Sequence, residues 1–468
     1  MRLLHNAGVV RALFDDPNLV SYAGLEPVMR LAESCDLQGI VRERLRVPTD
    51  KGANASGKVA TIVAGMVTGS DSIDDLDAMR HGGMAKLFGG VYAPSTLGSF
   101  LRAFTHGHVR QLHAVGREFL IQLARGTPLL PGADAVTFID VDSLLRRVYG
   151  KKKQGAGFGH AKVGGYQVLL RGLNALVATI STPLAAPVIA ATQLRGGSAS
   201  SARGAASLAA EAIVTAKAVL AEQCDVDNNL IVLRGDSAFY SRKVVTTCRR
   251  ARVRFSITIR VDKKVKRSIE AIPADAWVEI EYPQPVWDEQ QQRFVSRAQI
   301  AETRYTAFEG TRDEVTARLI VRRIPDLNRT VPDSQGELFP VWRYHAAFTD
   351  SPFVLVQAED HHRGHAIIEQ VFAELIDGPL AHLPSGRFDA NNAWLALTAI
   401  AHNLTRAAAT LAGHRYASAR AATIRRHLVN LAGRVARHAR GITIHLPEHW
   451  PWQPAWRKLF TATHPPPA

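Results

Sequence analysis

The chain has 468 residues, and its apolar fraction of 46% and charged fraction of 21% are ordinary for a globular protein with a large buried core. Lys and Arg number 57 against 42 Asp and Glu, and the net charge of +15 favours phosphate polyanions such as nucleic acid, although ribosomal, membrane-surface and simply soluble basic proteins share it. The three widely spaced cysteines exclude a disulfide framework and a Cys-x-x-Cys zinc pattern.

Residues 1–130 predict a helical N-terminal domain. Four segments carry apolar residues three and four positions apart, as amphipathic helices do: 19–35, 58–68, 95–104 and 109–124. The opening residues lack the apolar run of a signal peptide, and together with the unpaired cysteines this predicts a cytoplasmic protein. Pro128, Pro131 and Gly132 indicate a linker near residue 130.

Residues 131–261 predict an α/β core. Strand-like runs are expected at 136–142, 166–172, 175–181, 230–233 and 254–261, with helices at 205–223 and 241–252. This order predicts a mixed sheet with helices on both faces. The apolar stretch 166–194 is interrupted by Arg171, Asn174, Pro183 and Pro187, which argues against a membrane span.

The remaining chain divides into three parts. Residues 262–356 alternate short β-type runs with polar turns and predict a β-rich insertion. Residues 357–440 predict a return to the core followed by C-terminal helices at 391–412 and 417–438. Residues 441–468, rich in Pro and Trp, are expected to form an irregular arm.

Two aspartates end the first core strand. Alternation places Phe138, Asp140 and Asp142 on one face of that strand. Neighbouring carboxylates on an apolar strand repel unless a cation bridges them, so a bound Mg²⁺ is one interpretation. A turn cap at the strand end is the other.

Two further acids have informative surroundings. Asp236 ends the buried run Leu-Ile-Val-Leu-Arg-Gly-Asp, at the strand edge where α/β sheets gather ligands, with N-capping by Asp236 or Ser237 as the alternative. Glu369 stands beside the helical stripe formed by Ile368 and Val371, where it faces a site or solvent. Glu359 and Glu374 are weaker candidates for the same role.

Together Asp142, Asp236 and Glu369 can form a carboxylate cage for two divalent metals, which cuts and rejoins nucleic acid. Basic residues suited to phosphate contacts, or to solvated loops, are Arg146, Lys151, Lys152, Lys153, Lys263, Lys264, Arg425 and Arg426. The histidines at 361, 362 and 365 have no partner at zinc spacing, and Gly-Asp-Ser-Ala-Phe lacks the pattern of a hydrolase elbow.

The chain resembles the DDE-type insertion-sequence transposases, most closely the insertion-sequence thirteen-eighty group. The resemblance covers about residues 135–440 and is carried by Ile-Asp-Val-Asp-Ser (139–143), Arg-Gly-Asp-Ser-Ala-Phe-Tyr (234–240), the β-rich insertion and His-Ala-Ile-Ile-Glu-Gln-Val-Phe-Ala-Glu-Leu (365–375). It implies an RNase H-like core with Asp142, Asp236 and Glu369 as catalytic acids. Ser143 favours Asp142 over Asp140, because the family's first acid is usually followed by Ser or Thr.

The third motif departs from a wider family signature. That signature has Tyr and Arg before the Glu and Lys after it, where this chain has His362, His365 and Ile376. The two histidines can contact phosphate, whereas Ile376 cannot.

The resemblance implies a DNA transposase that cleaves terminal inverted repeats and joins them to target DNA, with two Mg²⁺ ions at the acids and Mn²⁺ as a substitute. Asp140 is retained as a further candidate metal ligand. The N- and C-terminal parts would bind double-stranded DNA within a homodimer. Two alternatives remain: a catalytically silent DNA-binding protein, and a structure-specific nuclease with the same core.

Overall fold

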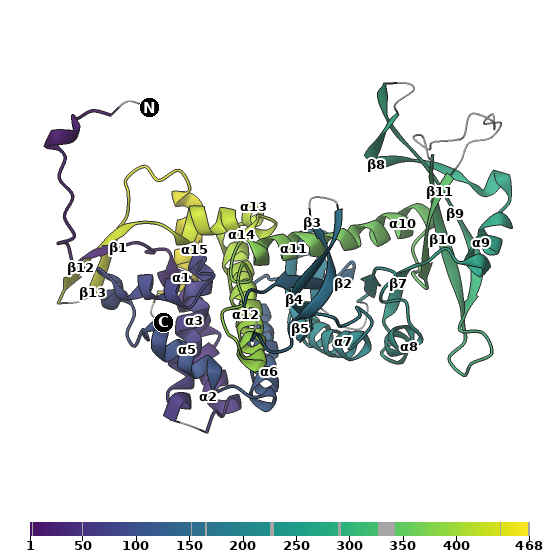
Figure 1. Cartoon of the computed structure of the whole chain (residues 1–468). Helices are drawn as coiled ribbons and strands as arrows, with labels where there is room; N and C mark the ends of the chain where they lie inside the picture. Colours follow the sequence, from purple (N-terminus) through teal and green to yellow (C-terminus); the bar gives the residue numbers. More distant parts are fainter. Residues whose placement is uncertain are drawn as a thin grey trace.

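The computed structural model describes residues 1, 3–48, 50–150, 152–163, 166–224, 229–288, 292–325, 342–439 and 441–466. Figure 1 shows a helical body built from both ends of the chain, a central sheet with flanking helices, and a strand-rich extension on the far side. The predicted mixed α/β architecture, a large mixed sheet flanked by helices, is confirmed.

The central sheet has ten strands in the described residues, in the order β3-β4-β2-β6-β7-β11-β10-β9-β8, with β5 paired to β4. The strands are β2 (Thr137–Arg147), β3 (Gly157–Val163), β4 (Tyr166–Thr182), β5 (Ala185–Gly196), β6 (Ile231–Gly235), β7 (Arg254–Ile259), β8 (Val278–Asp288), β9 (Arg293–Ala307), β10 (Val315–Pro325) and β11 (Trp342–Thr349). Because β11 pairs with β7, the strands of the predicted insertion continue the core sheet.

Parallel pairing is confined to β2, β6 and β7 among the described strand pairs. α7 (Ala205–Ala221) and α8 (Arg242–Arg250) supply the connections that parallel strands require. In Figure 1 they lie on one side of the sheet, while α10 (Leu355–Arg363) and α11 (Ile367–Ile376) run along the other. β6 ends beside Val141 of β2, β2 continues beyond it to Arg147, and α11 contacts β2.

The helical body surrounds one long buried helix, α12 (Phe388–Ala412). It packs against α3 (Ala55–Thr68), α6 (His106–Gly126) and α15 (Gln453–Thr463). The other helices of this body are α1 (Leu25–Ser34), α2 (Leu37–Arg44), α4 (Met84–Leu87), α5 (Pro94–Arg102), α13 (His414–Ala417) and α14 (Ala421–Ile424). The helical N-terminal part is as predicted, and no helix in the described ranges is long and apolar enough to cross a membrane.

Asparagines on α12 cover the outer edge of β5. The side chain of Asn403 accepts a hydrogen bond from the Ile189 amide at 2.7 Å and donates one to the Ile189 carbonyl at 2.8 Å. Asn392 accepts from the amide of Leu194 at 3.4 Å. An unpaired sheet edge presents polar backbone groups, and these side chains satisfy them where α12 buries the strand.

Replacing Asn403 by Ala is expected to lower the free energy of unfolding by about 2–4 kcal/mol, because two buried backbone groups lose their partner. Urea denaturation measures the change. The exposed Asn6, which makes no capping bond, is the control, and Asn6→Ala is expected to change stability by less than about 0.5 kcal/mol. Equal effects in the two variants would contradict the role given to Asn403.

The core contains more strand than the sequence predicted. The runs 166–172 and 175–181 merge into the single strand β4, and β3 and β5 pair beside it. Gly172 suits the middle of β4, because a Cβ there would lie 2.3 Å from the carbonyl oxygen of Arg146 on the neighbouring strand. The expected order of three strands before α7 is therefore corrected to four.

The expectations of a helix over 417–438 and of an irregular arm over 441–468 are wrong. After α14 and a π-helical turn (Arg425–Val429), the chain forms β12 (Gly433–His438), which pairs with β13 (Gly441–His445) and with β1 (Leu19–Val20). Gly433 fits tightly there, since a Cβ would lie 2.9 Å from that of Ala23. The tail forms α15, because a proline in the first turn is compatible with a helix and Trp456 and Leu459 are buried.

Candidate active site

Two candidate acids lie beside each other on neighbouring parallel strands. The register pairs Asp140 with Arg234 and Val141 with Gly235, so Asp142 and Asp236 lie one residue beyond the last registered pair of β2 and β6. Asp236 directly follows β6, whereas Asp142 lies within β2, which continues to Arg147, so the expectation that the first core strand ends at Asp142 is wrong. Both positions are partly buried. The pairing of β2 with β6 explains why residues almost a hundred positions apart in the sequence reach one place.

Asp142 experiences the charges of the other candidate acids. The pKa of its carboxyl is raised to about 7, mostly by burial and also by the negative charges of Asp236, Glu369 and Asp140, while a hydrogen bond from the Ser143 amide acts in the opposite direction. That amide lies 2.6 Å from Oδ1 of Asp142. The fold thus brings three separate segments close enough for mutual repulsion.

In this structure the carboxylates of Asp142, Asp236 and Glu369 do not form a closed metal-binding site. Among the described residues no group of three or more His, Cys, Asp or Glu side chains is arranged to hold a metal ion as it stands. The two observations agree, because charge repulsion acts over several ångströms whereas oxygen ligands must lie about 2.0–2.1 Å from Mg²⁺. Carboxylate oxygens suit a hard cation such as Mg²⁺. The side chains of Asp142, Asp236 and Glu369 would have to rotate toward one another to share one.

Asp236 caps the turn after β6. Its Oδ1 accepts a hydrogen bond from the Ala238 amide at 2.9 Å. The helix that follows, α8, is N-capped by Ser241, whose hydroxyl accepts from the Val244 amide. The alternative that Asp236 or Ser237 caps this helix is therefore wrong, although the turn contact uses one lone pair of Asp236.

Glu369 lies in the first turn of α11 and is exposed. Ile368 and Val371 are buried beside it and hold the helix on the sheet. The two weaker candidates are engaged elsewhere: Glu359 pairs with Arg322 and Arg363, and Glu374 pairs with Arg406 at 3.4 Å. Among these three glutamates, Glu369 is the one whose charge reaches Asp142.

Asp140 differs from the expectation that it helps to hold a metal. Its side chain is fully buried, and both oxygens accept hydrogen bonds from Arg234 at 2.7 Å. The same guanidinium donates to the carbonyl oxygen of His361 at 2.6 Å and lies 3.8 Å from the ring centre of Phe138. Arg234 therefore ties β2 and β6 to α10, and its bidentate contact occupies the carboxylate that a cation would need.

The sequence did not reveal this role for Arg234. The available signal was its place in Leu-Ile-Val-Leu-Arg-Gly-Asp, where one charged residue interrupts an otherwise apolar buried strand. Buried charges are paired, so such a residue predicts an acidic partner. The partner itself, on another strand, could not be read from local spacing.

The raised pKa of Asp142 has a measurable consequence in protein without bound cation. Between its usual value of 3.8 and about 7, the folded state retains a proton that the unfolded state has released, so the free energy of unfolding is expected to fall as pH rises through this range. Urea denaturation between about pH 4 and about pH 8 measures this slope. Asp142→Asn should flatten it, whereas the exposed Asp77→Asn should not; an unchanged slope in Asp142→Asn would contradict the shift.

The basic residues proposed to contact DNA fall into two groups. Lys152, Lys263 and Arg426 are exposed. Others make internal contacts: Arg146 donates to the Ala381 carbonyl, Lys153 to that of Leu383, Lys264 to that of Thr306 and Arg425 to that of Asp377. Lys151 lies outside the described residues. Of these candidates, Lys152, Lys263 and Arg426 are therefore the ones whose exposure suits contact with DNA phosphates.

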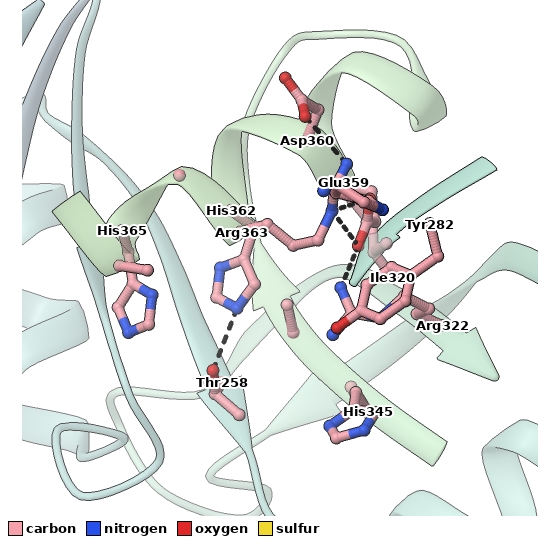
Figure 2. Close-up of a pocket in the computed structure, with 15 residues that line it drawn as sticks. Thr258, Tyr282, Ile320, Arg322, His345, Glu359, Asp360, His362, Arg363 and His365 are labelled. Atoms are coloured by element: carbon pink, nitrogen blue, oxygen red, sulfur yellow. Dashed lines mark hydrogen bonds and ion pairs between the residues drawn. The ribbon is translucent and has the colours of Figure 1, made fainter. Parts of the chain in front are cut away.

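The helix that leads to Glu369 borders a cavity of about 470 Å³. Figure 2 shows His362 and His365 at the junction of α10 and α11, with Thr258 below them and the Arg322, Glu359 and Arg363 contacts on the other side. The His362 ring lies 2.9 Å from the Ser256 hydroxyl and 3.0 Å from that of Thr258.

These contacts correct the expectation for His362. Burial lowers the pKa of its ring to about 3, and the nearby His365 and Arg234 act in the same direction. A neutral ring with both nitrogens engaged cannot serve as a cationic phosphate contact. His365 stacks beside it, with ring centres 5.9 Å apart, and lines the cavity.

Comparison with known families gives one match. The model described as transposase DDE domain group 1 matches residues 4–465. No curated protein matches the chain. The family match spans both the sheet that carries the acids and the helical body.

Proposed function

Because the chain belongs to the family of transposases with a DDE domain of group 1, we propose that it cuts and joins DNA by metal-dependent phosphoryl transfer. Its substrates are the terminal inverted repeats of an insertion sequence and a target duplex, and we assign it to the insertion-sequence thirteen-eighty group with an RNase H-like core. The observation that carries the proposal is the position of Asp142 next to Asp236 on paired strands, close enough to Glu369 for its charge to add to the effect of burial on the pKa of Asp142.

In this proposal Asp142, Asp236 and Glu369 hold two Mg²⁺ ions, for which Mn²⁺ can substitute. Carboxylate oxygens are the ligands that Mg²⁺ prefers, and a cation would relieve the repulsion that, together with burial, raises the pKa of Asp142. Ions held there would supply activation of the attacking oxygen and stabilisation of the leaving oxygen. We leave Asp140 out of the set because Arg234 engages both of its oxygens.

The three acids stand on different kinds of secondary structure. Asp142 lies within β2 and Asp236 directly follows β6, and these two strands are hydrogen-bonded to each other, so the backbones of both acids are fixed. Glu369 stands on a helix and has the long side chain needed to reach toward them. We propose that Asp142 and Asp236 define the position of the scissile phosphate and that Glu369 completes the site when DNA is bound.

The proposed reaction has two balanced steps. In cleavage, a water oxygen bonds to phosphorus, the bond from phosphorus to the 3′-oxygen breaks, and the water proton is released while the 3′-oxygen becomes a hydroxyl. In joining, that hydroxyl oxygen bonds to a target phosphorus, and the target's own 3′-oxygen leaves with the proton. The number of phosphodiester bonds is unchanged in the second step.

Partners follow from the same proposal. The net charge of +15 and the exposed Lys152, Lys263 and Arg426 suit contacts with a DNA backbone. We propose a homodimer that pairs two DNA ends, because joining both ends of an element to one target requires two active sites close together. The helical body, built from the N- and C-terminal parts, is the proposed end-binding region.

A strand-transfer assay tests the function. Purified full-length protein is incubated with Mg²⁺, a labelled duplex that carries the inverted repeat flanking its gene, and a supercoiled target plasmid. Labelled DNA covalently joined to the plasmid is the expected product. Cleavage without joining would favour a structure-specific nuclease, and binding without cleavage in Mg²⁺ or Mn²⁺ would favour a silent DNA-binding protein.

A further inference from the structure

The C-terminal part of the chain contains a second cavity, of about 450 Å³, whose lining includes none of the candidate acids. It lies between α13, the π-helical turn Arg425–Val429 and the start of α15. Aromatic rings and basic side chains line it, and no acidic side chain does: the rings are Tyr416, His427 and Trp452, the cations are Arg415 and Lys458, and His414 lies beside them. The cavity is therefore chemically distinct from the carboxylate site.

The rings of this cavity are held in fixed orientations. His427 and Trp452 stack face to face, with centres 3.6 Å apart and planes inclined by 10°. The Tyr416 hydroxyl lies 3.2 Å from Nδ1 of His427, and the Trp450 indole donates to the His427 carbonyl at 3.0 Å. Trp450 also meets Trp452 edge to face at 5.0 Å. This network orients a partly exposed aromatic surface before any ligand arrives.

The cations at the rim are not neutralised within the protein. Arg415 and Lys458 are exposed, and neither forms an ion pair with a described acidic residue. Some exposed arginines of the same helical body are paired, as Arg30 is with Glu33 at 2.7 Å. Uncompensated positive charge beside a preoriented aromatic surface is the combination that binds single-stranded nucleic acid, through phosphate contacts and base stacking.

We propose that this cavity binds a short single-stranded segment of DNA, with a base against the Trp452 and Tyr416 rings and the flanking phosphates at Arg415 and Lys458. A duplex does not suit it, because paired bases keep their faces inside the helix and a cavity of about 450 Å³ holds only a small ligand. The choice of DNA rests on the proposed function, but binding at this cavity requires no cutting.

Binding is measured with the full-length protein in EDTA, so that failure of the proposed catalysis does not affect the result. The probe is a fluorescent oligothymidylate of about 12 nucleotides, compared with a duplex of equal length. The double variant Arg415→Ala/Lys458→Ala is expected to bind the single strand at least about tenfold more weakly. A plot of the logarithm of the binding constant against the logarithm of the salt concentration should have a slope shallower by about 1.4 for this variant. Each of the two lost phosphate contacts to a single strand contributes about 0.7 to that slope.

Three further variants separate the contributions. Trp452→Leu should weaken single-strand binding by about tenfold through lost stacking. Lys458→Glu, an exposed change that leaves the rings in place, should weaken it as well. Arg457→Ala removes a neighbouring exposed cation of α15 that does not line the cavity, and is expected to have little effect. Wild-type affinity in Lys458→Glu and the double variant, an equal loss in Arg457→Ala, or an equal loss for the duplex would overturn the proposal.

Discussion

Asp142→Asn, Asp236→Asn and Glu369→Gln are each expected to reduce DNA cleavage at least about a thousandfold, while leaving binding of the DNA ends intact. Each change removes a charge from the set that we propose to hold the metal ions. Metal stabilisation of the transition state is worth several kcal/mol, and about 4 kcal/mol corresponds to this factor. Single-turnover cleavage of an end duplex in Mg²⁺ measures the loss, and gel retardation in EDTA measures binding.

The replacement side chains have nearly the same size and shape as the original ones. The variants are therefore expected to fold, and a loss of cleavage reports the loss of the charge. Asp142→Asn should even stabilise the metal-free protein above about pH 7, because it removes a carboxylate whose ionisation is opposed by burial. Glu33→Gln is the control, since that glutamate is exposed on α1 and pairs with Arg30. Cleavage that persists in all three variants would refute the assignment of the acids.

Arg234→Met is expected to lower the free energy of unfolding by about 3–5 kcal/mol, because it leaves the buried carboxylate of Asp140 without its partner. Thermal or urea denaturation of the full chain measures the change. The double variant Arg234→Met/Asp140→Leu should recover much of the stability, since both buried charges are then absent. An additive loss in the double variant would contradict the coupling.

A matched exposed pair provides the control for Arg234. Arg80 contacts Asp77 at 2.6 Å, with side chains 40% and 41% exposed, against 4% and 0% for Arg234 and Asp140. Arg80→Met is expected to cost less than about 1 kcal/mol, because solvent screens an exposed pair. The difference between the two arginine variants isolates the contribution of burial.

Much of the core could be predicted from the sequence because its strands are strongly patterned. The apolar run Leu230–Leu233 has no amphipathic alternative, and β6 is buried along its whole length. The apolar stripe of α11 was equally clear, with Ile368, Val371 and Leu375 all buried. In both cases a local period fixes the element without reference to the rest of the chain.

The errors arose where distant partners decide the structure. Residues 433–438 (Gly-Arg-Val-Ala-Arg-His) have a composition that a helix can also accommodate, and pairing with β1 and β13 makes them a strand. At the candidate site, local spacing placed Asp140 and Asp142 on one face of the strand. It could not show that Arg234 would donate hydrogen bonds to both oxygens of Asp140. The assignment of the acids themselves remains a prediction.

The pairing of β1 with β12 has a consequence for synthesis of the protein. The Val435 amide donates to the Asn18 carbonyl at 2.9 Å, and the Ala23 amide donates to that of Leu431 at 2.8 Å. At about 5–20 residues per second, a ribosome needs roughly 20–80 s to make the roughly 400 residues that separate these partners. The segment that contains β1 must therefore wait until residues 433–445 have emerged, and translation products that end before them cannot complete this three-stranded sheet.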